Sequence, residues 1–225
     1  EDEFSGLPDK ELLATEFPDL DLNHPWHLGT ENAIELALES EEAARNFHVE
    51  ITNSEGASIN THQGNYVMGN SLGFLHGYPT TRHSLSCSVL AQRSDSMQRD
   101  YWYSVARNAI NLESPKEIGK KAAERVLRRL EGRSLSTRQC PVLYSAEIAS
   151  GLLASFIGAI SGGNLYRKSS FLLNALDTQV FPEFISIYEQ PHLKGALGSA
   201  AYDGEGIATK SRDIVSDGIL RSYVL

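Results

Sequence analysis

Alternating side-chain character over residues 81–91 is the feature that most constrains the fold. Every second position from His83 to Val89 holds an apolar or aromatic side chain, and the positions between them hold serine. Because successive side chains of a β-strand point to opposite faces, this pattern predicts a strand with one buried and one solvated face. On that strand Cys87 is expected to be a buried thiol, and His83 is expected at the edge of the apolar face.

Residues 48–103 as a whole are predicted to form a run of consecutive strands. Turn residues divide this run at 53–56, 69–71 and 94–97. The segments 74–78 and 81–91 are each predicted to form a strand. Strands that follow one another through short turns pair antiparallel, and the sheet is therefore expected to be largely antiparallel.

Two amphipathic helices are predicted to flank the sheet. The first spans residues 30–47, with Thr30 as its N-cap. The second opens at Ser114 with a capping box, carries an apolar stripe over 118–130, and closes at Gly132. A basic cluster toward its C-terminal end consists of Arg125, Arg128, Arg129 and Arg133. The helix dipole and a solvated face explain this cluster, which can also be interpreted as an anion site.

A nearly uniformly apolar helix is predicted after residue 145. Between Ile148 and Ile160 only Ser150 and Ser155 are polar. A helix that is apolar on all sides is expected in a protein core, and this one is too short to cross a bilayer.

Glycines mark both the face and the end of this helix. Gly151 and Gly158 are seven residues apart, so they share a face on which another backbone can approach. Gly162 and Gly163 are expected to stop the helix, and Ser145 is expected to cap its start.

The remaining segments give weaker signals. Residues 1–29 are acidic and turn-rich, which is typical of an extended surface segment. Residues 133–139 have the polar, aperiodic composition of a domain junction. Strands are predicted at 140–144 and 184–188, and a hairpin is predicted over 213–225 with its turn at Asp217-Gly218.

Composition excludes several classes of function. The net charge of −9 argues against a direct nucleic-acid surface, because phosphate binding needs clustered Lys and Arg. No apolar run is long enough to span a membrane, and no signal peptide is expected. Two cysteines, Cys87 and Cys140, are too few for a disulfide framework, so a reduced, cytoplasmic setting is expected.

Short motifs give no strong indication of catalysis. His24 and His27 are spaced to share a metal only if further ligands join them, and the other histidines show no metal-ligand spacing. The Gly-x-Ser-x-Gly match at 69–73 lacks the following helix of a nucleophile elbow, so a hairpin turn is the favoured interpretation.

Matching in order along essentially the whole chain identifies a family resemblance. The chain resembles the TldD/PmbA family, once called modulators of DNA gyrase, and in particular its PmbA (TldE) branch. The segments that carry the resemblance are 51–56, 69–73, 81–86, 158–163, 166–169, 212–214 and 218–220.

This resemblance implies a fold and a degenerate zinc site. TldD-type members are zinc proteases with a His-Glu-x-x-x-His pattern on the helix that resembles residues 145–160. Aligned on 166–169, the three motif positions are Ala154, Ser155 and Ala159, so no metal ligand or catalytic residue is expected in this chain. The structural residues of this helix and loop are expected to be Gly151, Gly158, Gly162, Gly163 and Arg167.

The expected class is α+β, a largely antiparallel sheet with flanking helices followed by the start of a β-rich domain that contains one buried helix. Residues 1–132 are expected to be the C-terminal portion of an N-terminal α+β domain, and residues 133–225 the start of the C-terminal domain. The chain is expected to be the middle of a longer protein.

The resemblance implies a cytoplasmic complex of this subunit with a TldD-type metalloprotease subunit, which would hold the zinc. Unfolded peptides, including antitoxins and microcin-type precursors, are the implied substrates. Two alternatives stay open: a self-sufficient metallopeptidase, and a stand-alone module that binds peptides at an exposed strand edge.

Overall fold

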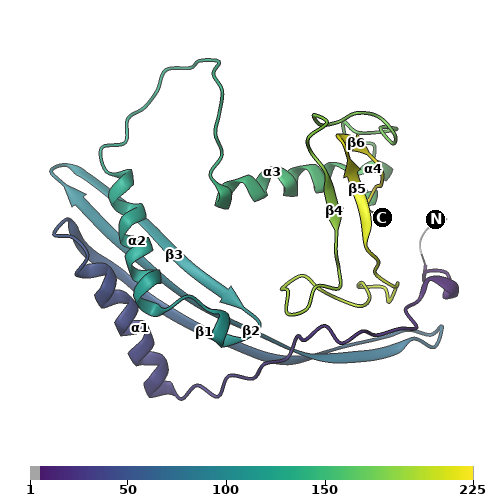
Figure 1. Ribbon diagram of the computed structural model, residues 1–225, viewed down its shortest axis with the longest axis horizontal. Coiled ribbons are helices and arrows are strands. Elements are labelled where there is room, and N and C mark those ends of the chain that lie inside the picture. Colours follow the sequence, from purple (N-terminus) through teal and green to yellow (C-terminus); the bar gives the residue numbers. More distant parts are fainter. Residues whose placement is uncertain (1–5, 225) are drawn as a thin grey trace. The chain divides into compact units, whose positions relative to one another are not determined.

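The computed structural model describes residues 6–224, which fold as two compact units. Residues 6–134 form one unit together with residues 192–209, and residues 135–191 form the other with residues 210–224. Each unit contains its own antiparallel three-stranded sheet (Figure 1). The predicted α+β class is confirmed. None of the helices among residues 6–224 is both long and apolar enough to cross a membrane.

The larger sheet belongs to the first unit and has the strand order β1-β2-β3. Its strands are β1 (Ile51–Gly69), β2 (Leu75–Arg93) and β3 (Ser96–Ala106). β2 pairs antiparallel with β1 from Leu75 to Ala91, and its second half also pairs with β3, where Cys87 lies opposite Trp102. The predicted largely antiparallel sheet is therefore confirmed.

One predicted division of this sheet is wrong. The turn expected at Asn53–Gly56 lies inside β1, where the register against β2 shifts and Gly56 adopts φ +100°. The segments 74–78 and 81–91 contribute to one strand, β2. A bulge uses the same Asn, Ser and Gly chemistry as a turn, so the local sequence does not separate the two.

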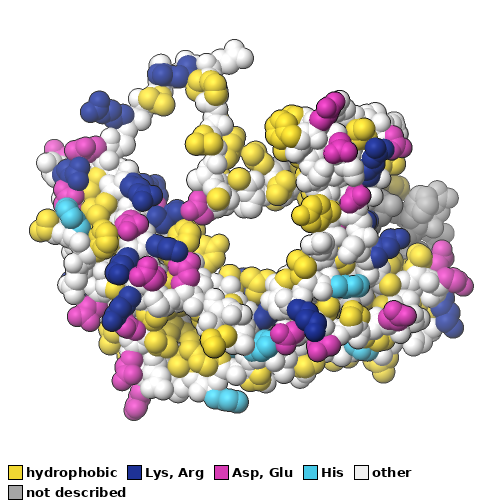
Figure 2. Space-filling model, viewed as in Figure 1, with side chains coloured by type: hydrophobic (Ala, Val, Ile, Leu, Met, Phe, Trp, Pro, Cys, Tyr) yellow, Lys and Arg dark blue, Asp and Glu magenta, His cyan; other side chains and the backbone are white. Residues whose placement is uncertain are grey.

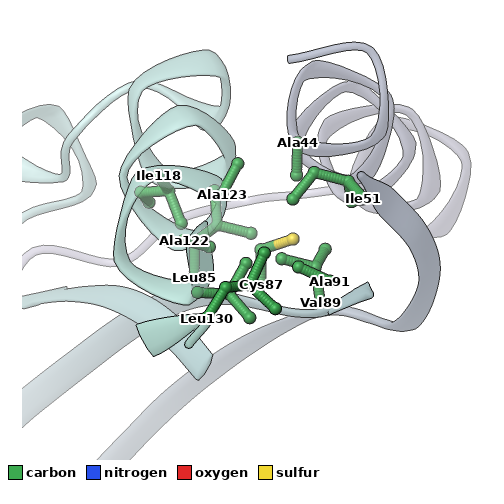
Figure 3. Packing of buried hydrophobic residues seen from close by; sticks show 11 residues of the cluster. Ala44, Ile51, Leu85, Cys87, Val89, Ala91, Ile118, Ala122, Ala123 and Leu130 are labelled. Atoms are coloured by element: carbon green, nitrogen blue, oxygen red, sulfur yellow. The ribbon is translucent and has the colours of Figure 1, made fainter. Parts of the chain in front are cut away.

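Two helices, α1 (Thr30–Arg45) and α2 (Pro115–Arg129), pack on one face of the larger sheet. Figure 3 shows their shared core. Its buried members are Ala44, Ile51, Leu85, Cys87, Val89, Ala91, Ile118, Ala122, Ala123, Val126 and Leu130. The predicted stripe of α2 and the buried Cys87 are confirmed. His83 is wholly buried but does not belong to this apolar cluster.

Gly119 brings α1 and α2 into close contact. A Cβ atom at this position would lie 2.1 Å from the carbonyl oxygen of Ser40 and 3.0 Å from the backbone nitrogen of Ala44. Both neighbours are backbone atoms of α1, so no change of rotamer can relieve the clash. This crossing therefore requires glycine at residue 119.

The helix ends follow the sequence signals only in part. The Ser114 hydroxyl accepts a hydrogen bond from the backbone N–H of Glu117 at 3.3 Å, which confirms the predicted cap of α2. Gly132 does not close this helix, because Glu131 takes the left-handed conformation at φ +63°. Thr30 is the first residue of α1 and not its N-cap, which is one residue earlier.

The arginines of α2 are more than a solvated face. Arg125 and Arg129 lie 3.4 and 3.5 Å from the Asp100 carboxylate on β3, and the Arg125 guanidinium lies 5.2 Å from the ring centroid of Trp102. Arg128 is exposed, with Glu124 at 3.8 Å. On the face shown in Figure 2, basic and acidic side chains are interspersed over this part of the chain. These contacts join α2 to the sheet.

A second cluster in the first unit combines residues far apart in the sequence. Its buried members are Leu13, Ala14, Leu20, Leu22, Phe74, Ala201 and Tyr202. The Tyr202 hydroxyl donates to the carbonyl oxygen of His76 at 3.1 Å. The N-terminal segment is therefore extended, as predicted, but it is partly buried and not a surface linker; its first five residues lie outside the described range.

Backbone hydrogen bonds and one arginine hold these segments to β2. Thr81 donates its N–H to the carbonyl oxygen of Leu22 at 2.9 Å. Arg107 donates to the carbonyl oxygens of Thr81 at 3.0 Å and of Leu197 at 2.7 Å. Short 3-10 helices occur at Lys10–Leu12 and Ala109–Asn111.

The second unit has a small sheet in the order β4-β5-β6. Its elements are α3 (Ala146–Ala159), α4 (Gly162–Tyr166), β4 (Ile187–Glu189), β5 (Arg212–Ser216) and β6 (Ile219–Leu220). Asp217 and Gly218 take φ values of +50° and +78°, which confirms the predicted hairpin turn, although β6 is shorter than expected. The strand predicted at 140–144 is wrong, because that segment is irregular and exposed.

α3 is a helix at the predicted place, but the prediction that it is buried is wrong for the described chain. Its buried residue is Phe156, which packs with Ile160 in the core of the second unit. Ile148 is 64% exposed and Leu152 is 50% exposed. Only the last turns of α3 reach this small core. Apolar composition shows that a helix can be buried, but it does not show which surface covers it.

Candidate functional site

The positions expected to be degenerate zinc positions lie on the C-terminal half of α3. Ala154 and Ser155 are exposed, and Ala159 is half-buried beside the core of the second unit. The Ser155 hydroxyl donates to the carbonyl oxygen of Gly151 at 2.9 Å, within its own helix. Alanine offers no lone pair to a metal, and a serine hydroxyl is a weak ligand and a weak base. This donor set does not fit a zinc ion.

The loop after α3 is held together by one amide that sequence reasoning missed. Asn164 donates from Nδ2 to the carbonyl oxygen of Gly158 at 2.6 Å, and its Oδ1 accepts from Arg167 at 3.0 Å. The Ser169 hydroxyl donates to the Asn164 carbonyl oxygen at 3.2 Å. Asn164 thereby links the end of α3 to α4 and to the following turn. Its only sequence signal was its place directly after two glycines.

The glycines of this region have roles different from those predicted. A Cβ atom at Gly151 or Gly158 would have no atom within 4 Å, so neither is a packing position in this structure. Gly162 and Gly163 do not stop α3; they form the first turn of α4, and the Gly162 N–H donates to the carbonyl oxygen of Val224 at 2.7 Å. At Gly163 an added Cβ would meet the Arg167 guanidinium at 3.5 Å.

Two histidines of the first unit, His24 and His83, have structural partners. His24 contacts the Asp21 carboxylate at 3.2 Å. The ring of His83 lies between the Thr61 hydroxyl at 2.8 Å and the carbonyl oxygen of His24 at 2.9 Å. Within residues 6–224, no three His, Cys, Asp or Glu side chains come close enough to hold a metal ion.

The Gly-x-Ser-x-Gly segment is a hairpin turn, which confirms the favoured interpretation. It joins β1 to β2, two antiparallel strands, rather than a strand to a helix. The Asn70 side-chain oxygen accepts from the N–H groups of Leu72 at 3.1 Å and of Phe74 at 3.3 Å, which fixes the turn.

A pocket of about 250 Å³ lies in the first unit, and no sequence motif indicated it. Phe17 stacks on the ring of His76 with centroids 3.5 Å apart, and Tyr202 meets Phe17 edge-on at 6.0 Å. Burial and the neighbouring Tyr66 raise the pKa of Tyr78, which lines the pocket. Phe17, His76 and Tyr78 give this pocket aromatic walls.

Comparison with known proteins gives the family. Residues 23–130 match the model of the PmbA/TldA metallopeptidase central domain, and residues 137–225 match that of the PmbA/TldA metallopeptidase C-terminal domain. The chain belongs to the PmbA/TldD metallopeptidase family, as its motifs predicted.

The similarity extends over the whole chain. It is 47% identical over 224 residues to Metalloprotease PmbA of Escherichia coli O157:H7 and 46% identical to the PmbA homolog of Haemophilus influenzae. The fold matches the crystal structure of a protein from Bacteroides thetaiotaomicron named as a modulator of DNA gyrase, with a TM-score of 0.90, 30% identity, and coverage of 99% of this chain and 52% of that one. All of this chain aligns with the two curated relatives, but it spans only about half (50%) of their length.

Proposed function

We propose that the chain belongs to the non-catalytic, PmbA (TldE)-type subunit of a two-subunit zinc protease. The observation that carries the proposal is the set Ala154, Ser155 and Ala159 on α3, where TldD-type members carry two zinc ligands and a general base. The Ser155 hydroxyl is also engaged with its own helix. In this proposal the zinc and the bond-cleaving chemistry belong to a TldD-type partner.

The proposed substrates are unfolded or flexible peptides, including antitoxins and microcin-type precursors, and the proposed location is the cytoplasm. A protease of this kind must hold an extended chain across the metal and exclude folded proteins. A subunit that keeps the family fold without the zinc groups can still supply one wall of such a chamber.

The test uses the full-length protein and the TldD-type protein of the same source, produced together and separately. We expect an unstructured peptide to be cleaved by the mixture, slowly or not at all by the partner alone, and not by this subunit alone. The two proteins should co-elute in size-exclusion chromatography. If the partner cleaves equally fast alone and the two elute separately, the subunit proposal fails.

A self-sufficient metallopeptidase is the second candidate, because the named relatives are metalloproteases. Elemental analysis separates the two candidates. About one tightly bound zinc per full-length subunit, lost together with activity on chelation, would favour the second candidate. The proposal predicts no stoichiometric zinc in this subunit. It also predicts that the triple variant Ala154→His, Ser155→Glu and Ala159→His is not an efficient protease, because the groups that orient the ligands are missing.

A further inference from the structure

The pocket lined by Phe17 lies in the first unit and contains no residue of α3 or α4. It lies between residues 17–23 and the β2 residues His76, Tyr78 and Pro79. A volume of about 250 Å³ is slightly below the range of typical drug-sized sites, so it suits one side chain or a small molecule.

Its walls are fixed by the surrounding structure. The backbone of Leu20 accepts from the N–H of Gly195 at 2.8 Å, and that of Leu22 accepts from Thr81 at 2.9 Å. Tyr202, which is 1% exposed, packs edge-on against Phe17 at 6.0 Å and against Tyr78 at 5.8 Å. The aromatic walls are therefore pre-organised, which lowers the entropic cost of binding.

The charge of the pocket has one sign. Its charged lining residues are Asp19 and Asp21, and no lysine or arginine belongs to the lining. The His24 ring, which is not part of the lining, contacts the Asp21 carboxylate at 3.2 Å, so the Asp19 carboxylate is the one without a basic neighbour among these contacts. The Asp19 side chain accepts from the N–H of Asp21 at 3.0 Å, and Asp21 holds φ +55°. The positive charge of Arg107 favours a lower pKa of Tyr78, against the larger effect of burial. The Arg107 guanidinium does not line the pocket and donates hydrogen bonds to backbone carbonyl oxygens.

Aromatic faces beside carboxylates attract organic cations, because the ring quadrupole and the negative charge act in the same direction. We propose that this pocket binds an alkyl ammonium or guanidinium group, with the alkyl stem against Phe17 and Tyr78 and the charge at Asp19 and Asp21. Two sources share this chemistry: a free small amine, and a Lys or Arg side chain of a peptide. The inference goes beyond the proposed protease role and does not depend on it.

The test is a titration followed by two-dimensional NMR and calorimetry. The probes are agmatine, N-acetyl-arginine amide and its neutral isostere N-acetyl-citrulline amide. We expect both cations to shift the amide signals of residues 17–23 with a Kd of about 1 mM, and the citrulline compound to bind at least about tenfold more weakly. Added salt should weaken the binding of both cations.

Substitutions of lining residues test whether the cations bind in this pocket. Asp19→Asn with Asp21→Asn should weaken agmatine about tenfold, since asparagine keeps the acceptor oxygen and tolerates positive φ. The matched control, Glu35→Gln with Glu205→Gln, removes the same charge elsewhere and should leave the Kd unchanged. Phe17→Leu keeps apolar volume but removes the ring, and should weaken agmatine about two- to fivefold.

Three results would overturn the proposal: equal binding of citrulline and arginine amides, equal loss in the control variant, or no saturable shift at about 20 mM agmatine. The comparison of the citrulline and arginine amides uses the unmodified chain, so it tests the proposal even if a variant does not fold. Tighter binding of the arginine amide than of agmatine would support the proposal with a peptide as source, and the reverse order would support it with a free amine.

Discussion

Substitution of Gly119 by alanine tests the crossing of α1 and α2. A Cβ atom there would lie 2.1 Å from the Ser40 carbonyl oxygen, more than 1 Å inside ordinary van der Waals contact. The helices must move apart, which loosens the core around Ala122 and Ala123. Overpacking of a well-packed core costs typically 1–3 kcal/mol and occasionally more. A clash with backbone atoms belongs at the upper end of that range, so we expect about 3 kcal/mol.

Helix propensity acts in the opposite direction, because alanine is better than glycine in a helix by about 1 kcal/mol. The net loss is then about 2 kcal/mol in the free energy of unfolding. For a chain of this size that corresponds to a fall in Tm of roughly 4–8 °C. Both tryptophans, Trp26 and Trp102, belong to the first unit, so tryptophan fluorescence during urea and thermal unfolding follows the relevant transition.

The first unit offers a matched control in Gly198→Ala, where the added Cβ would meet nothing within 4 Å. This variant should be neutral or slightly stabilising. If Gly119→Ala unfolds at the same urea concentration as the unmodified protein, or at a higher one, the close backbone contact is wrong.

Three further predictions concern single groups. Asn164→Ala removes hydrogen bonds at the end of α3 and should lower local stability by about 1–2 kcal/mol, seen as faster hydrogen exchange over 160–169; unchanged exchange would contradict the linking role. Iodoacetamide at mildly alkaline pH should modify the exposed Cys140 and spare Cys87, because burial raises the pKa of the Cys87 thiol; mass spectrometry that finds both labelled alike in the native protein would refute this. The hydrogen bond from Arg93 lowers the pKa of Glu50. The ion pair therefore stabilises the fold fully above the ordinary glutamate pKa, and this stabilisation is lost as pH falls through the lowered pKa of Glu50. The difference in urea midpoint between the unmodified chain and Glu50→Gln should therefore exist at neutral pH and vanish in acid; a difference that persists in acid would show that the ion pair is not its source.

Much of the first unit could be predicted from the sequence, because its signals are local. The alternation over 81–91 correctly placed Cys87 in the core, and the Ser114 cap and the apolar stripe correctly placed α2. Three features depend on distant contacts and gave no local signal. They are the backbone approach at Gly119, the extent of β2, and the burial of the segment that contains Leu22.

The sequence could predict where along the chain the candidate site lies, but not which surfaces surround it. Residues 145–160 indicated the helix α3, and the family resemblance directed attention to Ala154, Ser155 and Ala159. Whether an apolar helix is covered depends on surfaces that its own sequence does not contain, and the exposed Leu152 illustrates this. The pocket beside Phe17 was not predictable either, because its walls come from three separated segments.

The first unit is discontinuous in sequence, and this has a consequence during synthesis. Residues 135–191 must be translated before the chain returns to that unit, and Tyr202 comes later still. At 5–20 residues per second, the interval between residue 134 and residue 202 is roughly 3–14 s. During that time the aromatic side chains of Phe74 and Tyr78 lack the ring that covers them in the folded unit. A nascent chain therefore presents a transient apolar surface at this hairpin, and ribosome-bound chaperones should be engaged until residue 209 has emerged.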